Sequence, residues 1–152
     1  LDGKWGYVDE TGNEVIPPKY DLVSLLFDEL ALVVLDQKWG YIDKAGNEVI
    51  PLKYDDTNLF RDGLAAVKLD KKWGYTDKTG DEVIPPKYDV AYSLKDGLAM
   101  VKLDGKYGYI DRAGNEVIPP KYDVAFPFED GLATVKLDGT KFKINKSGER
   151  VF

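Results

Sequence analysis

One short motif occurs four times in this chain, at a spacing that never changes. It reads Lys-Trp-Gly-Tyr-x-Asp in the first three copies, which begin at Lys4, Lys38 and Lys72. The fourth copy begins at Lys106 and has tyrosine in place of tryptophan. Consecutive copies begin 34 residues apart. A fixed period of this length indicates a repeat protein, whose units bury their apolar residues by stacking against one another.

The composition argues against two classes of partner. The 152 residues are 43% hydrophobic and 32% charged, as is typical of a folded, soluble chain. The net charge of −6 argues against nucleic acid, because that ligand needs a basic surface. The longest uninterrupted apolar run, residues 30–35, is far shorter than the ~20 residues of a membrane-spanning helix. We therefore expect neither nucleic-acid binding nor membrane insertion.

Catalytic and metal sites are disfavoured by the residue types present. The chain has no histidine and no cysteine, which excludes Ser-His-Asp triads, cysteine nucleophiles and zinc held by those ligands. Carboxylates recur in equivalent positions of every unit, which favours turn formation over a single acid–base pair; they include Asp9, Asp43, Asp77 and Asp111. Calcium in these turns is the rival interpretation, but each loop is too short to supply six oxygens. We expect no enzyme activity, no metal and no cofactor.

The third copy shows how one unit is built. Residues 64–69 have strand length, and the face formed by Ala65, Val67 and Leu69 is expected to point to the core. A tight turn leads to a second strand over residues 72–77. A turn opened by Asp and closed by Gly leads to a short third strand, residues 82–84, which Pro85-Pro86 is expected to end.

The predicted fold is all-β. Each unit is a three-stranded antiparallel meander, and the units stack as an open superhelical, solenoid-like array. Expected units cover residues 1–29, 30–63, 64–97 and 98–131, with a degenerate half-unit at 132–152. The alternative is a closed propeller-like ring, but propeller repeats are usually longer. Lys141-Phe142-Lys143 also replaces the aromatic pair, as in a polar capping unit. Because the sequence begins partway through a repeat, we expect it to be part of a longer protein.

The Trp-Gly pair has two interpretations. Glycine inside a strand indicates close approach by another backbone or by an aromatic ring. Core packing is therefore the favoured role of this set: Trp5, Trp39, Trp73, Tyr107, Gly6, Gly40, Gly74 and Gly108. The alternative is an exposed row of aromatic rings that stacks on sugars.

Other aromatic residues are the candidate binding residues. They follow the prolines or lie in the segments that differ between copies: Tyr20, Tyr54, Tyr88, Tyr122, Phe27, Phe60 and Phe128. The variable segments themselves are residues 22–28, 56–62, 90–96 and 124–130. Specificity is expected there, because loops on a rigid scaffold tend to carry function.

The repeated sequence resembles the bacterial WG (KWG) β-repeat family. The resemblance rests on Lys-Trp-Gly-Tyr-Ile-Asp, on Gly-Asn-Glu-Val-Ile-Pro-Pro-Lys-Tyr-Asp and on a Gly-Leu-Ala-x-Val strand, and it covers nearly the whole chain. It implies a bacterial parent protein at the cell surface, secreted or membrane-associated, and a role in molecular interaction. It implies no catalytic residue. This chain departs from the pattern at Tyr107, at Glu29 and in the apolar residues 25–27.

Taken together, the sequence predicts a non-catalytic β-repeat scaffold that acts as a protein-interaction module. The first alternative is a carbohydrate or cell-wall binding module that uses the aromatic rows. A further alternative is a structural spacer or an engineered repeat scaffold.

Overall fold

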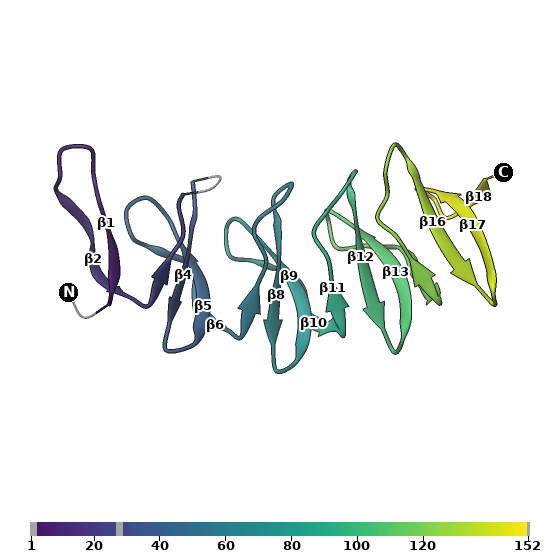
Figure 1. Ribbon diagram of the computed structural model, residues 1–152, viewed down its shortest axis with the longest axis horizontal. Helices are drawn as coiled ribbons and strands as arrows, with labels where there is room; N and C mark the ends of the chain where they lie inside the picture. The colour runs from purple at the N-terminus through teal and green to yellow at the C-terminus, as the bar shows by residue number, and fades with distance from the viewer. Residues whose placement is uncertain (1–2, 27–28, 152) are drawn as a thin grey trace.

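The computed structural model describes residues 3–26 and 29–151, which form five antiparallel sheets in succession along one axis (Figure 1). Sheet 1 contains β1 (Trp5–Val8) and β2 (Glu14–Tyr20). Sheet 2 contains β3 (Leu22–Val23), β4 (Ala31–Leu35), β5 (Lys38–Ile42) and β6 (Glu48–Tyr54). Sheet 3 contains β7 (Asp56–Thr57), β8 (Leu64–Leu69), β9 (Lys72–Asp77) and β10 (Glu82–Tyr88). Sheet 4 contains β11 (Val90–Ala91), β12 (Leu98–Leu103), β13 (Lys106–Asp111) and β14 (Glu116–Tyr122). Sheet 5 contains β15 (Val124–Ala125), β16 (Leu132–Leu137), β17 (Thr140–Asn145) and β18 (Arg150–Val151).

The predicted all-β stacked array is confirmed, and the stack is open. Sheet 1 and sheet 5 lie at opposite ends of the molecule, so the sheets do not close into a ring (Figure 1). The described residues contain no helix long and apolar enough to cross a bilayer.

Each complete sheet has one strand more than the three predicted. A two-residue strand precedes the long ones and pairs with the second strand, as Asp56 does with Lys68 and Thr57 with Val67. Two residues are too few to show a period-2 pattern, so this strand could not be predicted from the sequence. Each four-stranded sheet therefore takes its first strand from the end of the preceding expected unit.

The prolines do not end the third long strand, contrary to the sequence-based expectation. β10 runs from Glu82 to Tyr88, through both prolines. Ile84 pairs with Tyr75 and Tyr88 pairs with Trp73, so three residues of β10 lie opposite the single residue between Trp73 and Tyr75. Proline is tolerated in this irregular register because the bulged residues do not complete the ladder.

The bulge explains the glycine of the motif. A Cβ atom on Gly74 would lie 2.3 Å from the carbonyl oxygen of Ile84, closer than any real Cβ contact. Gly6, Gly40 and Gly108 meet the equivalent carbonyl at 2.2, 2.6 and 2.5 Å. The close approach is thus made by the backbone of the next strand in the same sheet.

The second strand of sheets 2, 3 and 4 buries both of its faces, where the sequence predicted one, whereas β16 of sheet 5 buries only the face that carries Ala133 and Val135. In β12, Ala99 and Val101 pack against sheet 3, whereas Leu98 and Met100 pack against sheet 5. The four apolar clusters therefore lie between consecutive sheets, and no single central core exists among the described residues. This distribution is expected of a stacked array, in which each unit contacts only its neighbours.

Candidate functional site

The four tyrosines predicted as binding residues lie inside the stack. Tyr20, Tyr54, Tyr88 and Tyr122 are at most 2% exposed. Each belongs to the apolar cluster between its own sheet and the next one. They are not available for a surface contact, so this prediction is corrected. The sequence placed them at a corner, but the strand continues through the prolines and carries them into the interface.

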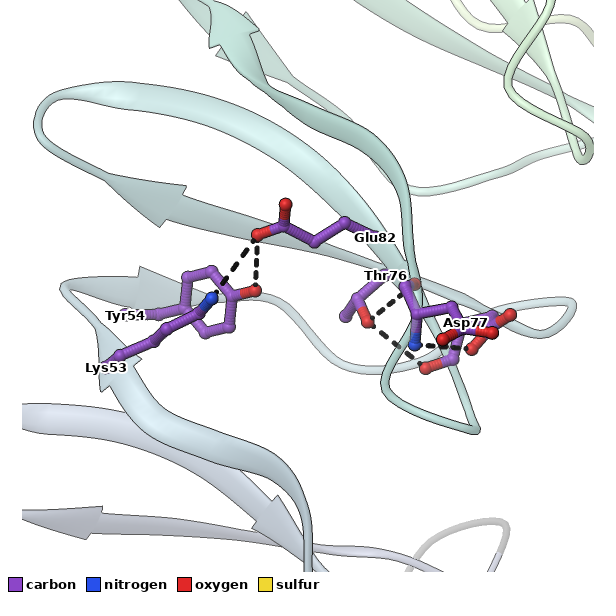
Figure 2. Close-up of polar contacts among 6 residues, drawn as sticks. Lys53, Tyr54, Thr76, Asp77 and Glu82 are labelled. Atoms are coloured by element: carbon purple, nitrogen blue, oxygen red, sulfur yellow. Dashed lines mark hydrogen bonds and ion pairs between the residues drawn. The ribbon is translucent and has the colours of Figure 1, made fainter.

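These tyrosines instead link neighbouring sheets. The Tyr54 hydroxyl donates a hydrogen bond to Glu82 of the next sheet at 2.9 Å, and Lys53 Nζ lies 3.6 Å from the same carboxylate (Figure 2). Tyr88 and Glu116 repeat the bond at 2.7 Å. Burial and the nearby Glu82 carboxylate raise the pKa of Tyr54 well above its ordinary value, which keeps the hydroxyl a donor.

Two of the three phenylalanines predicted as binding residues also face inward. Phe60 and Phe128 are 2% and 1% exposed, and their rings meet Tyr41 and Tyr109 edge-on at centroid distances of 4.9 and 4.8 Å. Their assignment as surface binding residues is therefore corrected as well. Phe27 lies outside the described residues.

The tryptophan row lies at the rim of the interfaces. Trp39, Trp73 and Tyr107 are half-buried and pack against the apolar clusters. Lysine side chains lie over two of these rings. Lys68 Nζ is 5.8 Å from the centroid of the Trp73 ring, and Lys102 Nζ is 5.1 Å from that of Tyr107. Trp5 differs, because 59% of its surface is exposed. The inner rings are thus placed for packing, and a cation also lies over one face of Trp73 and of Tyr107.

The stack has two edges, which lie at the two ends of its long strands. The hairpin edge carries the turns between the second and third strands, with ion pairs such as Lys38–Asp55 at 2.7 Å. We call the other edge the loop edge, which consists of the described loops preceding β4, β8, β12 and β16 and of the Asp-containing turns (Figure 1). The two edges lie at opposite ends of the same strands, because the second strand of each sheet begins after a loop and ends at a hairpin turn.

The loop edge exposes large apolar side chains in every variable segment. Leu25 is 87% exposed, Leu59 52%, Tyr92 40% and Phe126 51%. Single exposed apolar residues are ordinary, but here they recur on four successive loops. Leu25 and Leu59 share one position of the repeat, and Tyr92 and Phe126 share the position before it. We call Leu25, Leu59, Tyr92 and Phe126 the loop row. Sequence reasoning selected these segments but chose the wrong aromatic residues within them, since variability alone does not tell which side chain points outward.

Buried tyrosines of the repeated motif fix the position of these loops. Tyr41 donates to the carbonyl of Asn58 at 2.7 Å, Tyr75 to that of Tyr92 at 2.6 Å and Tyr109 to that of Phe126 at 2.6 Å. Each bond joins one sheet to the loop of the next sheet. Burial raises the pKa of Tyr41 to about 12, so its hydroxyl keeps the proton that it donates.

Neighbouring loops are also joined to one another. The Asn58 side-chain amide donates to the Ser93 hydroxyl at 3.0 Å, and the Gly131 amide donates to the Asp96 carboxylate at 2.7 Å. Lys146 pairs with the same Asp96 at 3.1 Å. The loop edge is therefore a connected surface held by the scaffold.

The repeated aspartates are used by their own turns. One oxygen of Asp9 accepts the backbone amides of Thr11 and Asn13, and hydrogen bonds led by the Thr11 hydroxyl lower the pKa of Asp9 to about 2. Asp43 accepts the amides of Ala45 and Asn47 in the same way. Among the described residues, no three acidic, histidine or cysteine side chains are grouped closely enough to hold a metal ion.

A known protein family matches this chain once in each repeat. The family model described as the WG containing repeat matches residues 5–39, 39–73, 73–107 and 107–140. No curated protein matches the sequence significantly.

The fold has similar solved structures at low identity. KlHsv2 with loop 6CD replaced by a Gly-Ser linker has a TM-score of 0.49 and 11% identity, over 91% of this chain and 54% of that chain. Kluyveromyces lactis Hsv2 with complete loop 6CD has a TM-score of 0.48 and 10% identity, over 81% and 45%. A protein of unknown function from Bacteroides caccae has a TM-score of 0.34 and 14% identity, over 99% and 74%. The present chain spans about half the length of the two Hsv2 chains.

Proposed function

Because this chain belongs to the family of proteins built from WG-containing repeats, we propose that it is a non-catalytic scaffold that binds a protein partner through its loop edge. The observation that carries the proposal is the loop row, because each variable segment exposes at least one large apolar side chain. The repeated residues form the stack, and the residues that differ between copies form this surface.

A protein ligand suits the loop row better than a sugar. Leucine, tyrosine and phenylalanine side chains at the centre of an interface release water when a partner covers them. Sugar stacking would use the faces of the motif rings, but Lys68 and Lys102 occupy the faces of Trp73 and Tyr107. The loops are also preorganised by the Tyr41, Tyr75 and Tyr109 bonds, which reduces the entropy lost on binding.

Site-specific photo-crosslinking tests the proposal in the organism of origin. A photoreactive amino acid at residue 59, 92 or 126 is expected to crosslink one common protein, whereas the same group at residue 71 or 105, on the hairpin edge, is expected not to. With the photoreactive group at residue 92, the loop-row variant Leu59→Ser, Phe126→Ser should lose the crosslinked protein while keeping the circular dichroism spectrum of the parent.

A matched variant on the other edge serves as the control. Lys71→Ser and Lys106→Ser alter exposed hairpin-edge residues and should leave the crosslink in place. The proposal is wrong if the hairpin-edge variant loses the partner and the loop-row variant retains it. It is also wrong if purified cell-wall glycans bind the chain and the loop-row variant binds them equally well.

A further inference from the structure

The net negative charge of the protein is concentrated at the loop edge. The loops and turns of this edge, with the equivalent turn after β17 included, cover residues 9–13, 24–26, 29–30, 43–47, 58–63, 77–81, 92–97, 111–115, 126–131 and 145–149. They contain 12 acidic side chains and 6 basic ones. The other described residues contain 13 acidic and 15 basic side chains. The loop edge therefore carries a net charge of −6, whereas the rest of the described molecule carries +2.

Ion pairs within the loop edge leave some of its carboxylates without a cation. Three cations pair with acids of the same edge: Lys44 with Glu29, Lys95 with Glu129 and Lys146 with Asp96. Asp62 and Asp130 occupy the position of Asp96 in two other loops, and no ion pair of the described residues includes either of them. Both carboxylates are exposed, and they lie in the same loops as Leu59 and Phe126. Uncompensated negative charge therefore accompanies the apolar side chains of the loop row.

This combination favours one class of ligand. Carboxylates beside an apolar surface repel an acidic partner and attract a basic one. A single divalent cation does not fit, because no three acidic side chains among the described residues are grouped closely enough to hold a metal ion. The charges are instead spread along the whole edge, over four loops and five turns. A ligand that matches them carries several cations along its length.

The spacing of the loops sets the length of such a ligand. Packed sheets are about 10 Å apart, and an extended chain advances about 3.3 Å per residue. About three residues therefore reach from one loop to the next, and about ten reach from the loop before β4 to the loop before β16. Hydrogen bonds between neighbouring loops, such as that from Asn58 to Ser93, hold this spacing.

Building on the proposed function, we propose that the protein partner binds the loop edge through an extended cationic segment. An apolar side chain at about every third residue of the segment packs on the loop row. Lysine or arginine side chains between them lie beside Asp62, Asp130 and the other exposed carboxylates of this edge. The negative edge also accelerates the encounter with such a segment, an effect that salt weakens.

Three synthetic peptides test the proposal on the whole 152-residue protein. The probe is four repeats of Phe-Lys-Ser. Four repeats of Phe-Glu-Ser reverse its charge, and four repeats of Ser-Lys-Ser keep the charge without the apolar side chains. At low salt, fluorescence anisotropy should show that the probe binds at least about tenfold more tightly than either control peptide. Amide resonances of residues 58–63, 92–97 and 126–131 should shift on binding, whereas those of the hairpin-edge residues 70–71 and 104–105 should not.

Two protein variants with the same net charge separate the local effect from the overall one. Asp62→Asn, Asp130→Asn removes two carboxylates from the loop edge, and Asp70→Asn, Asp104→Asn removes two from the hairpin edge. All four aspartates have φ values of 50° or 51°, a conformation that asparagine also adopts, so both variants should keep the parent circular dichroism spectrum. The first variant is expected to weaken binding of the probe at least about fivefold at low salt, and the second less than about twofold.

Equal effects of the two protein variants, equal binding of the probe and either control peptide, or no binding of the probe would each overturn the proposal. The proposed function has a separate outcome, because it fails if residues 59, 92 and 126 crosslink no common protein. A crosslinked protein that is retained equally by the loop-edge and hairpin-edge variants would leave the protein partner in place and rule out its cationic segment.

Discussion

At the scale of single residues, the glycines of this chain serve two separate purposes. Gly74 has no room for a side chain, because the Ile84 carbonyl lies over it. Gly97 has free space around it but a φ of +83°, which side-chain-bearing residues adopt only with strain. Phe142 occupies the position of Gly74 in the last sheet, where the described part of β18 reaches only as far as Lys143. Glycine is therefore needed at this position only where the backbone of the neighbouring strand lies against it.

Gly74→Ala should therefore destabilise the protein more than Gly97→Ala. The first change forces backbone atoms apart and is expected to lower the free energy of unfolding by about 2–3 kcal/mol. The second adds only conformational strain, at about 1 kcal/mol. Urea denaturation of both variants measures the difference. Equal losses of stability in the two variants would show that β10 can move away from residue 74 at little cost.

Glu29→Gly is expected to stabilise the chain. Glu29 has a φ of +70°, where the equivalent Gly63, Gly97 and Gly131 have φ values of +87°, +83° and +80°. Relief of this strain should raise the free energy of unfolding by about 1 kcal/mol. The lost Lys44–Glu29 ion pair is exposed and offsets little of that gain. Lys44→Ala is the control for the ion pair, and a loss of stability in Glu29→Gly would contradict the argument.

At the scale of turns and loops, side chains replace missing backbone partners. The Asp turns each fold around one carboxylate, and the last turn uses Asn145, whose side-chain oxygen accepts the amides of Ser147 and Glu149. An uncharged amide can therefore perform the same task. The charged version adds a dependence on pH that the amide version lacks.

In the double variant Asp9→Asn, Asp43→Asn, the free energy of unfolding should fall less at acidic pH than it does in the parent. The pKa of Asp9 falls from 3.8 to about 2 on folding, and backbone hydrogen bonding lowers the pKa of Asp43 as well. These groups therefore contribute stability above about pH 4 that is lost as the pH falls toward 2. Asparagine does not titrate, so urea midpoints at pH 7 and pH 3 should differ less in the variant. Alanine at both positions is the contrasting control, with lower stability at each pH.

Tyr75→Phe should increase the mobility of the loop that contains Tyr92 and leave the other loops unchanged. The change removes the hydrogen bond to the carbonyl of Tyr92, which is expected to cost about 1 kcal/mol. Hydrogen exchange should quicken in residues 92–97. The loops at 58–63 and 126–131 are internal controls, because Tyr41 and Tyr109 still hold them. Uniform quickening across all three loops would contradict local anchoring.

At the scale of the whole molecule, stability is shared between neighbours. The apolar clusters lie between sheets, so an inner sheet is covered on both faces and an end sheet on one. Within residues 3–26 and 29–151, sheet 1 also has two strands where the others have four. In such an array the free energy is approximately a sum over units and interfaces.

The β1 and β2 amides should therefore exchange faster than those of β8, β9, β12 and β13. Native-state hydrogen exchange measures this gradient directly. Low concentrations of urea should release sheet 1 first and leave the central sheets protected. Simultaneous release of all five sheets would show a single cooperative unit instead.

The sequence by itself determined the repeat, its strands and its turns, because these depend on residues close together in the chain. The Trp-Gly-Tyr spacing, the Asp-x-x-Gly turns and the 34-residue period identify the family. They favour an open stack over a closed ring, and the structure decided between the two. The two-residue strands escaped prediction, since nothing in two residues marks a period.

Only the tertiary structure decided which side chains face outward. Tyr54 and Phe60 looked like surface aromatics, yet the next sheet covers both. Leu59 and Tyr92 lie in the variable segments where specificity was expected but were not among the candidate residues, yet both are exposed. The physical reason is that burial in a stack depends on contacts between units, and a repeated sequence describes each unit without showing how its faces meet.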